Sequence, residues 1–579
     1  MIVKNYLLAL FIGFLLFSCK TGSSQFTDDN SIHQLHLSRV DAMPNLPEPF
    51  KVMDFKDMAK KFDALVYDET QMGEYWPLIW MDDSRKNFDQ ETFGIYTAMG
   101  DLRQGPHNND GIFHESLATV GSVFGATLVG IDKSNQNGKN YVSMLKNYFN
   151  SETNWDIVMN NTSPEVAMLG GGYGRDWWYD VYPNVLFYGV ANFYPDETHY
   201  TEIMRSVAEK FYDANAVLEG NYSHSFFDYA TLEPQDNWIC KQEDAAAGHA
   251  YVLYSAYQRF KEPKYLIGAK NSLEALLAQK DNRFYEILMP FGAYVAARLN
   301  AEEGTDYNYT KILEWTFDGT SVCREGWGVL VGNWNGYDIS GIVGSTVDHG
   351  GFGFLMNTYD TMWPLVPMVR YDQRYANAIG KWMLNASNAL KLFYPYEIPD
   401  EHQSIPELKH HTKGVIAYEG LIKQSHFEEY EHIKAPIAIG DGPHWVDGNP
   451  DVSQFSVYGS GHVGIAGAII SATNVDNILQ LDLLATDFYR NSAWPSYLYY
   501  NPNQEAKFVT ISVGEKSLKI YDAIQRRFIR ENVKGDFTFD ISRENAALLV
   551  MVPQTAGISE KNGKLYADGV VIDYRYSKN

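Results

Sequence analysis

The sequence predicts a mainly α-helical protein, an (α/α)6/7-type toroid of helical hairpins, followed by a small C-terminal antiparallel β domain. Three observations lead to this fold class. From Asp54 onward helical periodicity recurs in pairs, with small residues in one helix and an amphipathic stripe in the other. Long loops rich in glycine and aromatic residues separate alternate helices. After about residue 501 the spacing of apolar residues changes from that of a helix to that of a strand.

One helix pair illustrates the pattern. The stretch from Ala245 to Phe260 is rich in small residues and follows Asp244, which we interpret as its N-cap. Pro263 starts the partner helix, which carries an apolar stripe. We expect the helices with small residues to crowd at the centre of the toroid, and the long loops to form a cleft at one mouth. A solenoid of stacked helix pairs is the alternative, although it would have a regular repeat length.

The richest loop runs from Arg324 to Tyr359. Its glycines let the backbone bend sharply or approach a ligand closely, and ionisable and aromatic side chains stand between them. Irregular segments of this length are uncommon inside compact domains and are often functional. We interpret this stretch as part of a binding or catalytic site. The alternative is a connection that its own aromatic residues pack.

The C-terminal region reads as β structure. Val509, Ile511 and Val513 alternate with polar residues, and Asn562-Gly563 and Asp568-Gly569 are hairpin turn signals. We assign residues 46–500 to the catalytic toroid, with a last helix from Val475 to Tyr489. Residues 501–579 are assigned to a β-sandwich-like domain.

The N-terminus predicts a lipoprotein leader. An apolar run of signal-peptide length ends in Leu16-Phe17-Ser18-Cys19, which resembles a bacterial lipobox with Cys19 as the lipidated residue. Residues 1–19 then form the signal peptide and residues 20–45 a flexible tether. The protein would be anchored in the bacterial cell envelope, in the periplasm or on the outer-membrane surface. An ordinary secreted protein is the alternative.

Composition limits the partners. The formal net charge of −25 makes nucleic acid an unsuitable ligand. Besides Cys19 the chain contains only Cys240 and Cys323. We favour two buried thiols, because cysteine is commonly buried for packing alone, and a single bridge is the alternative in an oxidising compartment.

Several motifs resemble bacterial (α/α)-barrel glycoside hydrolases, and most closely the β-glucuronidase family, glycoside hydrolase family 154. They include Gly326-Trp-Gly-Val329, Ala417-Tyr-Glu-Gly420 and Gly459-Ser-Gly-His-Val-Gly464, and the likeness spans roughly Tyr75 to Met551. The resemblance implies an exo-acting enzyme. Its substrate would be plant or algal polysaccharide fragments, from which it removes β-glucuronic acid.

Glycoside hydrolysis requires one carboxyl group to protonate the leaving oxygen and a second carboxylate to attack or to activate water. The loop-borne candidates are Asp176, Glu243, Asp348 and Glu419. Asp176 stands beside tryptophan, which would raise the pKa of its carboxyl group, although an N-cap role is the alternative. Glu419 lies in the motif that resembles the family.

Substrate binding requires arginine for a uronate carboxylate and aromatic or polar groups for the sugar ring. The predicted substrate-binding residues are Arg175, Trp177, Arg324, Trp327, Tyr337, His349, Asn357, Tyr418, His444 and His462. Any single aromatic residue has core packing as its alternative role. The histidines lack a metal-ligand spacing, so we predict no catalytic metal and no cofactor.

Two other classes of protein remain open. A polysaccharide lyase on a similar toroid would use Tyr458 or His462 as the base beside a uronate carboxylate, and Asn357 or an arginine would neutralise that acid. A non-catalytic glycan-binding lipoprotein would require aromatic residues but no carboxylate pair. The hydrolase hypothesis accounts for the loop carboxylates, which the binding protein leaves without a role.

Overall fold

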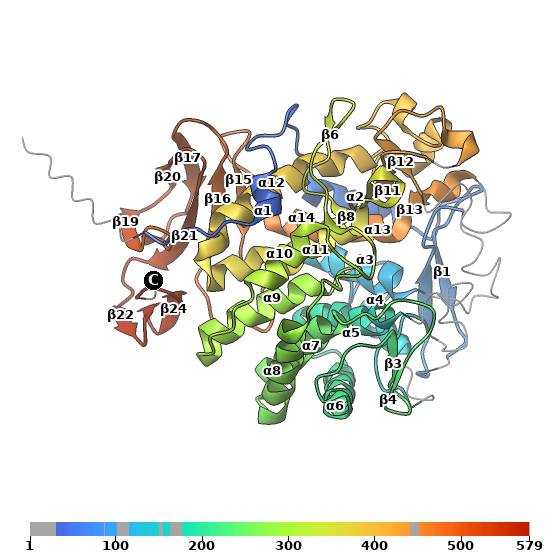
Figure 1. The fold of residues 1–579 in the computed structure, drawn as a ribbon, viewed down its shortest axis with the longest axis horizontal. Coiled ribbons are helices and arrows are strands. Elements are labelled where there is room, and N and C mark those ends of the chain that lie inside the picture. The colour runs from blue at the N-terminus through green and yellow to red at the C-terminus, as the bar shows by residue number, and fades with distance from the viewer. Residues whose placement is uncertain are drawn as a thin grey trace, which may run out of the picture.

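The computed structural model describes residues 31–85, 87–100, 115–149, 154–162, 176–425, 427–440 and 451–577. Within these residues the predicted helical toroid and C-terminal β domain are both present (Figure 1). No helix of the described part is long and apolar enough to cross a membrane.

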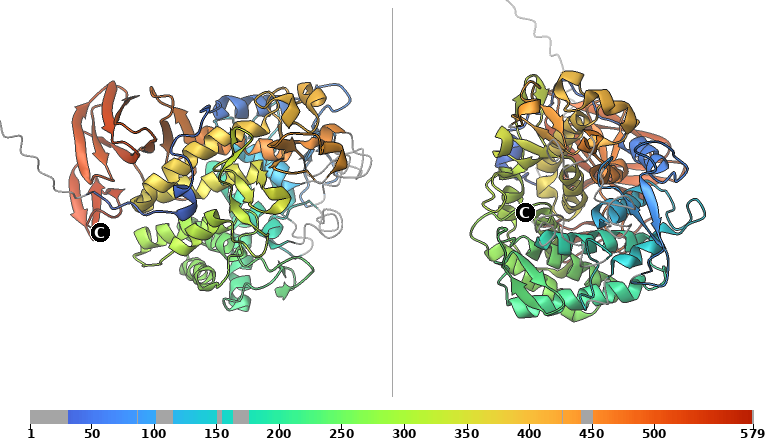
Figure 2. Two further views of the ribbon diagram at one scale, coloured as in Figure 1. Left: turned by 45° about the horizontal axis from the view of Figure 1, so that its top comes forward. Right: turned by 90° about the vertical axis from the view of Figure 1, so that its right-hand side faces the viewer.

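Inner helices form a closed ring at the centre of the described structure. Each packs on the next, and the last pair packs back on the first, so the solenoid alternative is wrong. The right-hand view of Figure 2 shows helices arranged around the centre of the molecule. In chain order the inner helices are α3 (Ser116–Leu128), α5 (Trp177–Phe193), α7 (Ala245–Phe260), α9 (Met289–Arg298), α11 (Leu355–Tyr371) and the pair α13 (Val457–Gly461) and α14 (Val463–Ile469).

Outer helices cover this ring and alternate with the inner ones along the chain. They are amphipathic as predicted: on α6, Ile203, Val207 and Phe211 are buried, whereas α7 is buried on nearly every face. The outer elements are α2 (Phe55–Val66), α4 (Tyr141–Met144) with the 3-10 turn η1 (Leu145–Tyr148), α6 (Tyr200–Leu218), α8 (Pro263–Ala278), α10 (Thr310–Asp318) and α12 (Ala376–Ala389).

Glycines close the ring between its first and last members. A Cβ atom at Gly125 of α3 would lie 2.2 Å from the Gly461 carbonyl oxygen, and one at Gly464 of α14 would lie 1.9 Å from the Gly125 carbonyl oxygen. The backbones of α3 and α14 therefore meet directly, which only glycine permits. The expectation that small residues allow the inner helices to crowd is met at this seam.

The glycine-rich stretch folds into short strands. β5 (Trp327–Val329), β8 (Val343–Ser345) and β9 (Phe352–Phe354) join β11 (Gly420–Ile422) and β12 (Ile437–Ile439) in an antiparallel sheet ordered β12-β11-β9-β8-β5. At its centre a Cβ atom on Gly344 would lie 1.9 Å from the Phe352 carbonyl oxygen. The glycines thus permit close strand approach. β6 (Asn333–Trp334) and β7 (Tyr337–Asp338) form a separate hairpin.

Three further two-stranded pairings lie within the first 460 residues. They are β1 (Ile79–Asp82) with β2 (Thr92–Ile95), β3 (Phe226–Asp228) with β4 (Glu233–Gln235), and β10 (Ala417–Tyr418) with β13 (Phe455–Ser456).

The C-terminal β domain begins earlier than residue 501. Its main sheet has the order β14-β15-β16-β21-β18-β19, and β17 pairs with β20. The helix expected from Val475 to Tyr489 is wrong, because β15 lies there and pairs with β14 and β16. The bounds are β14 (Ile470–Ala472), β15 (Leu479–Asp482), β16 (Ser496–Asn501), β17 (Lys507–Ser512), β18 (Leu518–Asp522), β19 (Arg527–Val533), β20 (Asp536–Ile541), β21 (Asn545–Pro553), β22 (Ile558–Lys561), β23 (Lys564–Ala567) and β24 (Val570–Asp573).

The described part of the expected tether is packed against the body. The Ile32 amide donates to the Ile524 carbonyl at 2.8 Å, and Leu37 and Val40 are buried. The short helix α1 (Ser38–Asp41) packs on α10 and α12. A flexible tether through residue 45 is therefore wrong for residues 31–45, because apolar side chains there enter the core.

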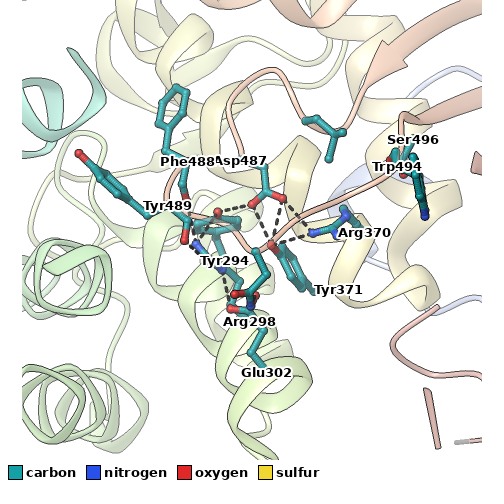
Figure 3. A network of polar contacts seen from close by, with 12 residues as sticks. Tyr294, Arg298, Glu302, Arg370, Tyr371, Asp487, Phe488, Tyr489, Trp494 and Ser496 are labelled. Atoms are coloured by element: carbon teal, nitrogen blue, oxygen red, sulfur yellow. Dashed lines mark hydrogen bonds and ion pairs between the residues drawn. The ribbon is translucent and has the colours of Figure 1, made fainter. Parts of the chain in front are cut away.

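A buried polar network joins the ring to the β domain at the C-terminal ends of α9 and α11 (Figure 3). The Asp487 carboxylate accepts hydrogen bonds from Tyr294 (2.6 Å), Tyr371 (3.0 Å) and Arg370 (3.1 Å). Arg298 donates to the Phe488 carbonyl at 3.0 Å. Cations are favoured at helix C-terminal ends, and here Asp487 matches the charge of Arg370 while Glu302 matches that of Arg298.

We expect Gly125→Ala to lower the free energy of unfolding by at least about 2 kcal/mol, since the new methyl group meets backbone that cannot rotate away. Chemical denaturation measures the change. Gly557→Ala is the matched control, because its Cβ atom would have Asp568 as its nearest neighbour, at 3.6 Å. Equal stability of the two variants would contradict the backbone-to-backbone seam.

Candidate functional site

The N-terminal ends of α5 and α7 share one tyrosine. The Tyr285 hydroxyl donates to Asp176 Oδ2 at 3.0 Å, and the Tyr285 amide donates to Asp244 Oδ2 at 3.1 Å. Asp176 and Asp244 occupy the N-cap positions of α5 and α7, but neither side chain caps its helix. The interpretation of Asp244 as a side-chain cap is therefore wrong. Both carboxyl groups instead face the segment that leads into α9.

Burial controls the protonation of these two acids. It raises the pKa of Asp176 to about 6, against the smaller lowering effects of the Tyr285 hydroxyl and the Arg324 charge. Burial raises the pKa of Asp244 to about 7, although the Tyr285 amide favours the ionised form. The two groups can therefore hold protons close to neutral pH, which an exposed aspartate does not.

Arg324 forms the centre of the next group. Its guanidinium forms an ion pair with Glu286 and lies 3.8 Å from the centre of the Trp327 ring. Asn357, in the first turn of α11, donates to the other Glu286 carboxylate oxygen at 2.7 Å. Glu286 thereby fixes Arg324 beside the α5 and α9 ends, where its charge also acts on Asp176.

Glu419 lies beside the start of α11. Its backbone carbonyl accepts the Leu355 amide at 3.0 Å, at the start of that helix. Its carboxylate accepts a hydrogen bond from the hydroxyl of Tyr458, in the first turn of α13. The side chain is 8% exposed. A second acid is thus held one helix away from the Arg324 group.

Thr97 completes the circle between α13 and α3. Its carbonyl accepts the Tyr458 amide at 3.0 Å, and its hydroxyl donates to the carboxylate of Glu115, just before α3, at 2.6 Å. Contacts therefore connect the N-terminal ends of α3, α5, α7, α9, α11 and α13. The positive ends of their dipoles meet at one end of the ring, which favours an anionic ligand there.

His462 belongs to the wall of the ring. It is fully buried, with Nδ1 2.7 Å from Asp360 Oδ1 and Nε2 2.9 Å from the Leu117 carbonyl oxygen. Although burial lowers the pKa of His462, the Asp360 charge and these hydrogen bonds raise it above its usual value. Both ring nitrogens are engaged, so the predicted substrate contact and the role of lyase base are wrong for His462.

Several predicted sugar contacts lie in the core. Trp177 is fully buried, stacks with Tyr222 and donates to the Tyr229 hydroxyl at 3.1 Å. Tyr418 is also fully buried and donates to Gln403 at 3.2 Å. A substrate-stacking role for these two side chains is wrong, because core packing covers them.

Two further predicted contacts are buried but act on the site indirectly. Trp327 is fully buried, and its indole donates to the Glu286 carbonyl at 3.0 Å beneath Arg324. Asn357 is 1% exposed and holds Glu286. Direct sugar contact is therefore wrong for both side chains, which instead position Arg324.

The remaining candidates have other surroundings. The Asp348 carboxylate is about half exposed and lies 3.5 Å from His349, whose ring contacts Phe352. The hairpin residue Tyr337 packs edge-on against His402. Glu243 directly precedes Asp244, and its Oε1 atom lies 4.0 Å from Arg283 Nε. Of these residues, Glu243 adjoins the site, because its charge acts on the neighbouring Asp244 and helps to raise the pKa of that carboxyl group. Arg175, His444 and Cys19 lie outside the described residues.

A disulfide links two loops of the site. Cys240 and Cys323 are bonded, with their Cα atoms 5.4 Å apart and a sequence separation of 83 residues. The favoured expectation of two free thiols is wrong. Cys240 lies four residues before Asp244, and Cys323 directly precedes Arg324. The bond therefore joins the loop before Asp244 to the loop that carries Arg324.

Sequence reasoning missed Tyr285, Glu286 and Glu115. Each stands just before an inner helix, at the kind of junction that supplied the other candidates, so helix position alone would have indicated them. No group of three or more potential metal ligands exists among the residues that the structure describes.

No protein-family model and no curated protein sequence matches the chain. Among solved structures, the chain is similar to a GH127 β-L-arabinofuranosidase from Geobacillus stearothermophilus T6, at 10% identity and TM-score 0.32, over 90% of this chain and 85% of that one. A structure described as a glycoside hydrolase has 9% identity and TM-score 0.30, over 79% and 81%. A second GH127 β-arabinofuranosidase has 9% identity and TM-score 0.33, over 92% and 84%. At such low scores these likenesses carry no argument about activity.

We expect Asp244→Asn to stabilise the protein relative to the parent, by an amount that increases as the pH rises. The folded-state pKa of Asp244 lies above its unfolded value, so the stability that its protonated form contributes is lost as pH rises toward about 7. Asparagine retains the acceptor for the Tyr285 amide and cannot ionise. The gain in unfolding free energy should grow by about 2–3 kcal/mol between about pH 5 and about pH 8.

Urea denaturation at both pH values measures this gain. The exposed Asp196→Asn is the control and should show no such growth. A pH-independent difference for Asp244→Asn would contradict a buried, proton-holding carboxyl group.

Proposed function

We propose that this protein is an exo-acting glycoside hydrolase that removes uronic acid, with β-glucuronic acid as the favoured unit, from acidic polysaccharide fragments. The observation that carries the proposal is the buried Asp176 carboxyl group, whose pKa is raised to about 6 at the N-terminal end of an inner helix. A carboxyl group that holds its proton near neutral pH is what protonation of a leaving glycosidic oxygen requires.

Asp176 is assigned the role of general acid. Its Oδ2 atom is held by the Tyr285 hydroxyl, which fixes the orientation of the carboxyl group. Oδ1 makes no hydrogen bond to any residue within the described ranges. Tyr285 is thus a positioning residue, and its hydrogen bond restrains the rise in the pKa of Asp176.

Glu419 is assigned the role of second carboxylate. The Tyr458 hydroxyl donates to it, which stabilises the ionised form that must attack carbon or activate water. Glu286 is less suitable, because Arg324 and Asn357 engage both of its oxygens. Glu286 instead holds the arginine.

Arg324 is assigned to the uronate carboxylate. Its planar guanidinium suits recognition of a second carboxylate in addition to Glu286, and Trp327 supports it from below. The inner-helix N-terminal ends add positive potential at the same end of the ring. These features favour an anionic sugar in a chain whose formal net charge is −25.

A polysaccharide lyase is the second candidate, and the Tyr458–Glu419 pair is the observation that favours it. The Tyr458 hydroxyl can pass its proton to the Glu419 carboxylate, and the resulting phenolate can take the proton next to a uronate carboxylate. The bond to the leaving oxygen then breaks, a carbon–carbon double bond forms, and the leaving oxygen takes back the proton that Tyr458 removed. Products of this reaction absorb ultraviolet light, whereas hydrolysis releases free uronic acid. The two signals separate the candidates.

We expect Asp176→Asn to lower kcat on a uronate-capped oligosaccharide at least 100-fold, because general acid catalysis typically contributes that much. The parent enzyme should lose kcat/KM as the pH rises past about 6, since the protonated form of Asp176 is then lost. An aryl glucuronide with a good leaving group should restore much of the variant's rate. Released glucuronic acid and ultraviolet absorbance are followed together.

The exposed Asp213→Asn, on α6, is the matched control and should retain full activity. Loss of turnover that the aryl substrate does not restore would contradict the general-acid role. Activity within tenfold of the parent would contradict the site assignment as a whole. Glycan binding without turnover by the parent itself would support the binding-protein alternative.

We also propose that the protein is lipid-anchored through Cys19 in the cell envelope, where the Cys240–Cys323 disulfide suits an oxidising compartment. Cys19→Ala is expected to move most of the protein from the membrane fraction to the soluble fraction of a bacterial host. Immunoblotting of the two fractions measures the change, with a Ser18→Ala variant as the control. Unchanged fractionation of Cys19→Ala would contradict the anchor.

A further inference from the structure

The β domain contains a groove of about 720 Å³ that lies between the edge strand β19 and strand β20. This volume is within the range of small-molecule and oligosaccharide sites. The β domain meets the ring at the C-terminal ends of α9 and α11, so the groove lies away from the Asp176 group. In Figure 1 β19 and β20 are at the left of the molecule.

A β-bulge directs two arginines of β19 into this groove. Phe528 pairs with Tyr521 and Arg530 pairs with Ile520, so Ile529 is an extra residue in the strand. Without the bulge, positions 527 and 530 would point to opposite faces, because side chains alternate along a strand. The inserted residue places both arginines on one face, and both line the groove.

The two arginines have no ion-pair partner in the described chain, although the Arg527 charge acts on the buried Asp522 carboxyl group. Arg527 donates from Nε and Nη2 to the neutral Gln525 side chain, at 2.9 Å and 2.7 Å. Asp522, its cross-strand neighbour, is buried and uses one oxygen to accept the Ile524 and Gln525 amides. Within the described chain neither arginine forms an ion pair with a carboxylate, and Asp540 is the one acidic residue that lines the groove.

We propose that this groove is a second, non-catalytic binding site for acidic polysaccharide, with Arg527 and Arg530 holding carboxylates of one glycan chain. The choice of glycan rests on the function proposed above. In a protein with a net charge of −25, two aligned arginines without carboxylate partners favour an anionic ligand. The hydroxyl side chains of Thr538 and Ser542 line the groove beside them and suit sugar hydroxyl groups.

Such a site would raise the local concentration of polymer around the enzyme. A chain held at the groove reaches the catalytic end as a tethered substrate, which improves the use of long substrates without changing the chemical step. The effect should therefore appear in KM for polymer. It should be absent for a substrate of one sugar unit.

The test compares the double variant Arg527→Gln/Arg530→Gln with the parent. For the binding measurements both proteins also carry Asp176→Asn, so that the glycan is not turned over. Isothermal titration uses a glucuronate-containing hexasaccharide and its carboxyl-reduced form. We expect the double variant to lose one binding event, or to weaken it at least tenfold, while the reduced glycan binds neither protein there. With Asp176 intact, KM for polymer should rise at least threefold, and kcat/KM for an aryl glucuronide should stay unchanged.

Two controls keep the result specific. Lys516→Gln/Arg543→Gln removes two exposed positive charges of the same domain that do not line the groove, and should bind like the parent. Arg527→Lys/Arg530→Lys retains charge without the planar fork, and should keep part of the affinity. Melting temperatures identify any variant that fails to fold.

Parent-like binding by the glutamine double variant would overturn the proposal, as would equal binding of the carboxyl-reduced glycan. Equal binding of hexa-aspartate would overturn the choice of glycan. If the parent turns over no uronate glycoside but the double variant still loses the carboxylate-dependent binding event, the hydrolase function fails and the groove site stands.

Discussion

The direct contact between the backbones of α3 and α14 is the constraint on which the rest of the structure depends. These helices are more than 330 residues apart in sequence, and Gly125, Gly461 and Gly464 bring them together without intervening side chains. Closure places the start of α13 beside the loop before α3, where Thr97 contacts both Tyr458 and Glu115. Without this seam the inner helices would form an open stack. Their N-terminal ends would not then enclose one site.

Helix direction divides the molecule into two functional ends. The inner helices run the same way when the consecutive α13 and α14 are taken as one member, since an outer element then separates each member from the next. Their N-terminal ends carry acids, and two of these, Asp176 and Asp244, have pKa values raised by burial. At the other end the arginines at the C-termini of α9 and α11 meet the β domain through Asp487 and backbone carbonyls. Buried charge therefore gathers at the candidate site at one end and attaches the β domain at the other.

Secondary-structure elements could be predicted from the sequence more completely than the contacts between side chains. Helix pairing, the small-residue inner helices and the β domain follow from local periodicity, which a single sequence contains. Burial of Trp177 and Tyr418 depends on which face of an element meets the core, and loop position does not determine it. Glu286 acquires its role only through Arg324 and Asn357, both distant in sequence. The sequence therefore supplied Asp176 and Glu419 as candidates, whereas the residues that contact them could be identified only in the fold.

The Cys240–Cys323 bond has a consequence for proteolysis. The covalent loop that it closes contains α7, α8, α9 and α10, and thus two inner and two outer helices of the ring. A cut at an exposed turn inside this loop, such as Lys261 between α7 and α8, would leave both fragments joined beside Asp244 and Arg324. A molecule nicked in this way keeps the two loops of its candidate site covalently joined.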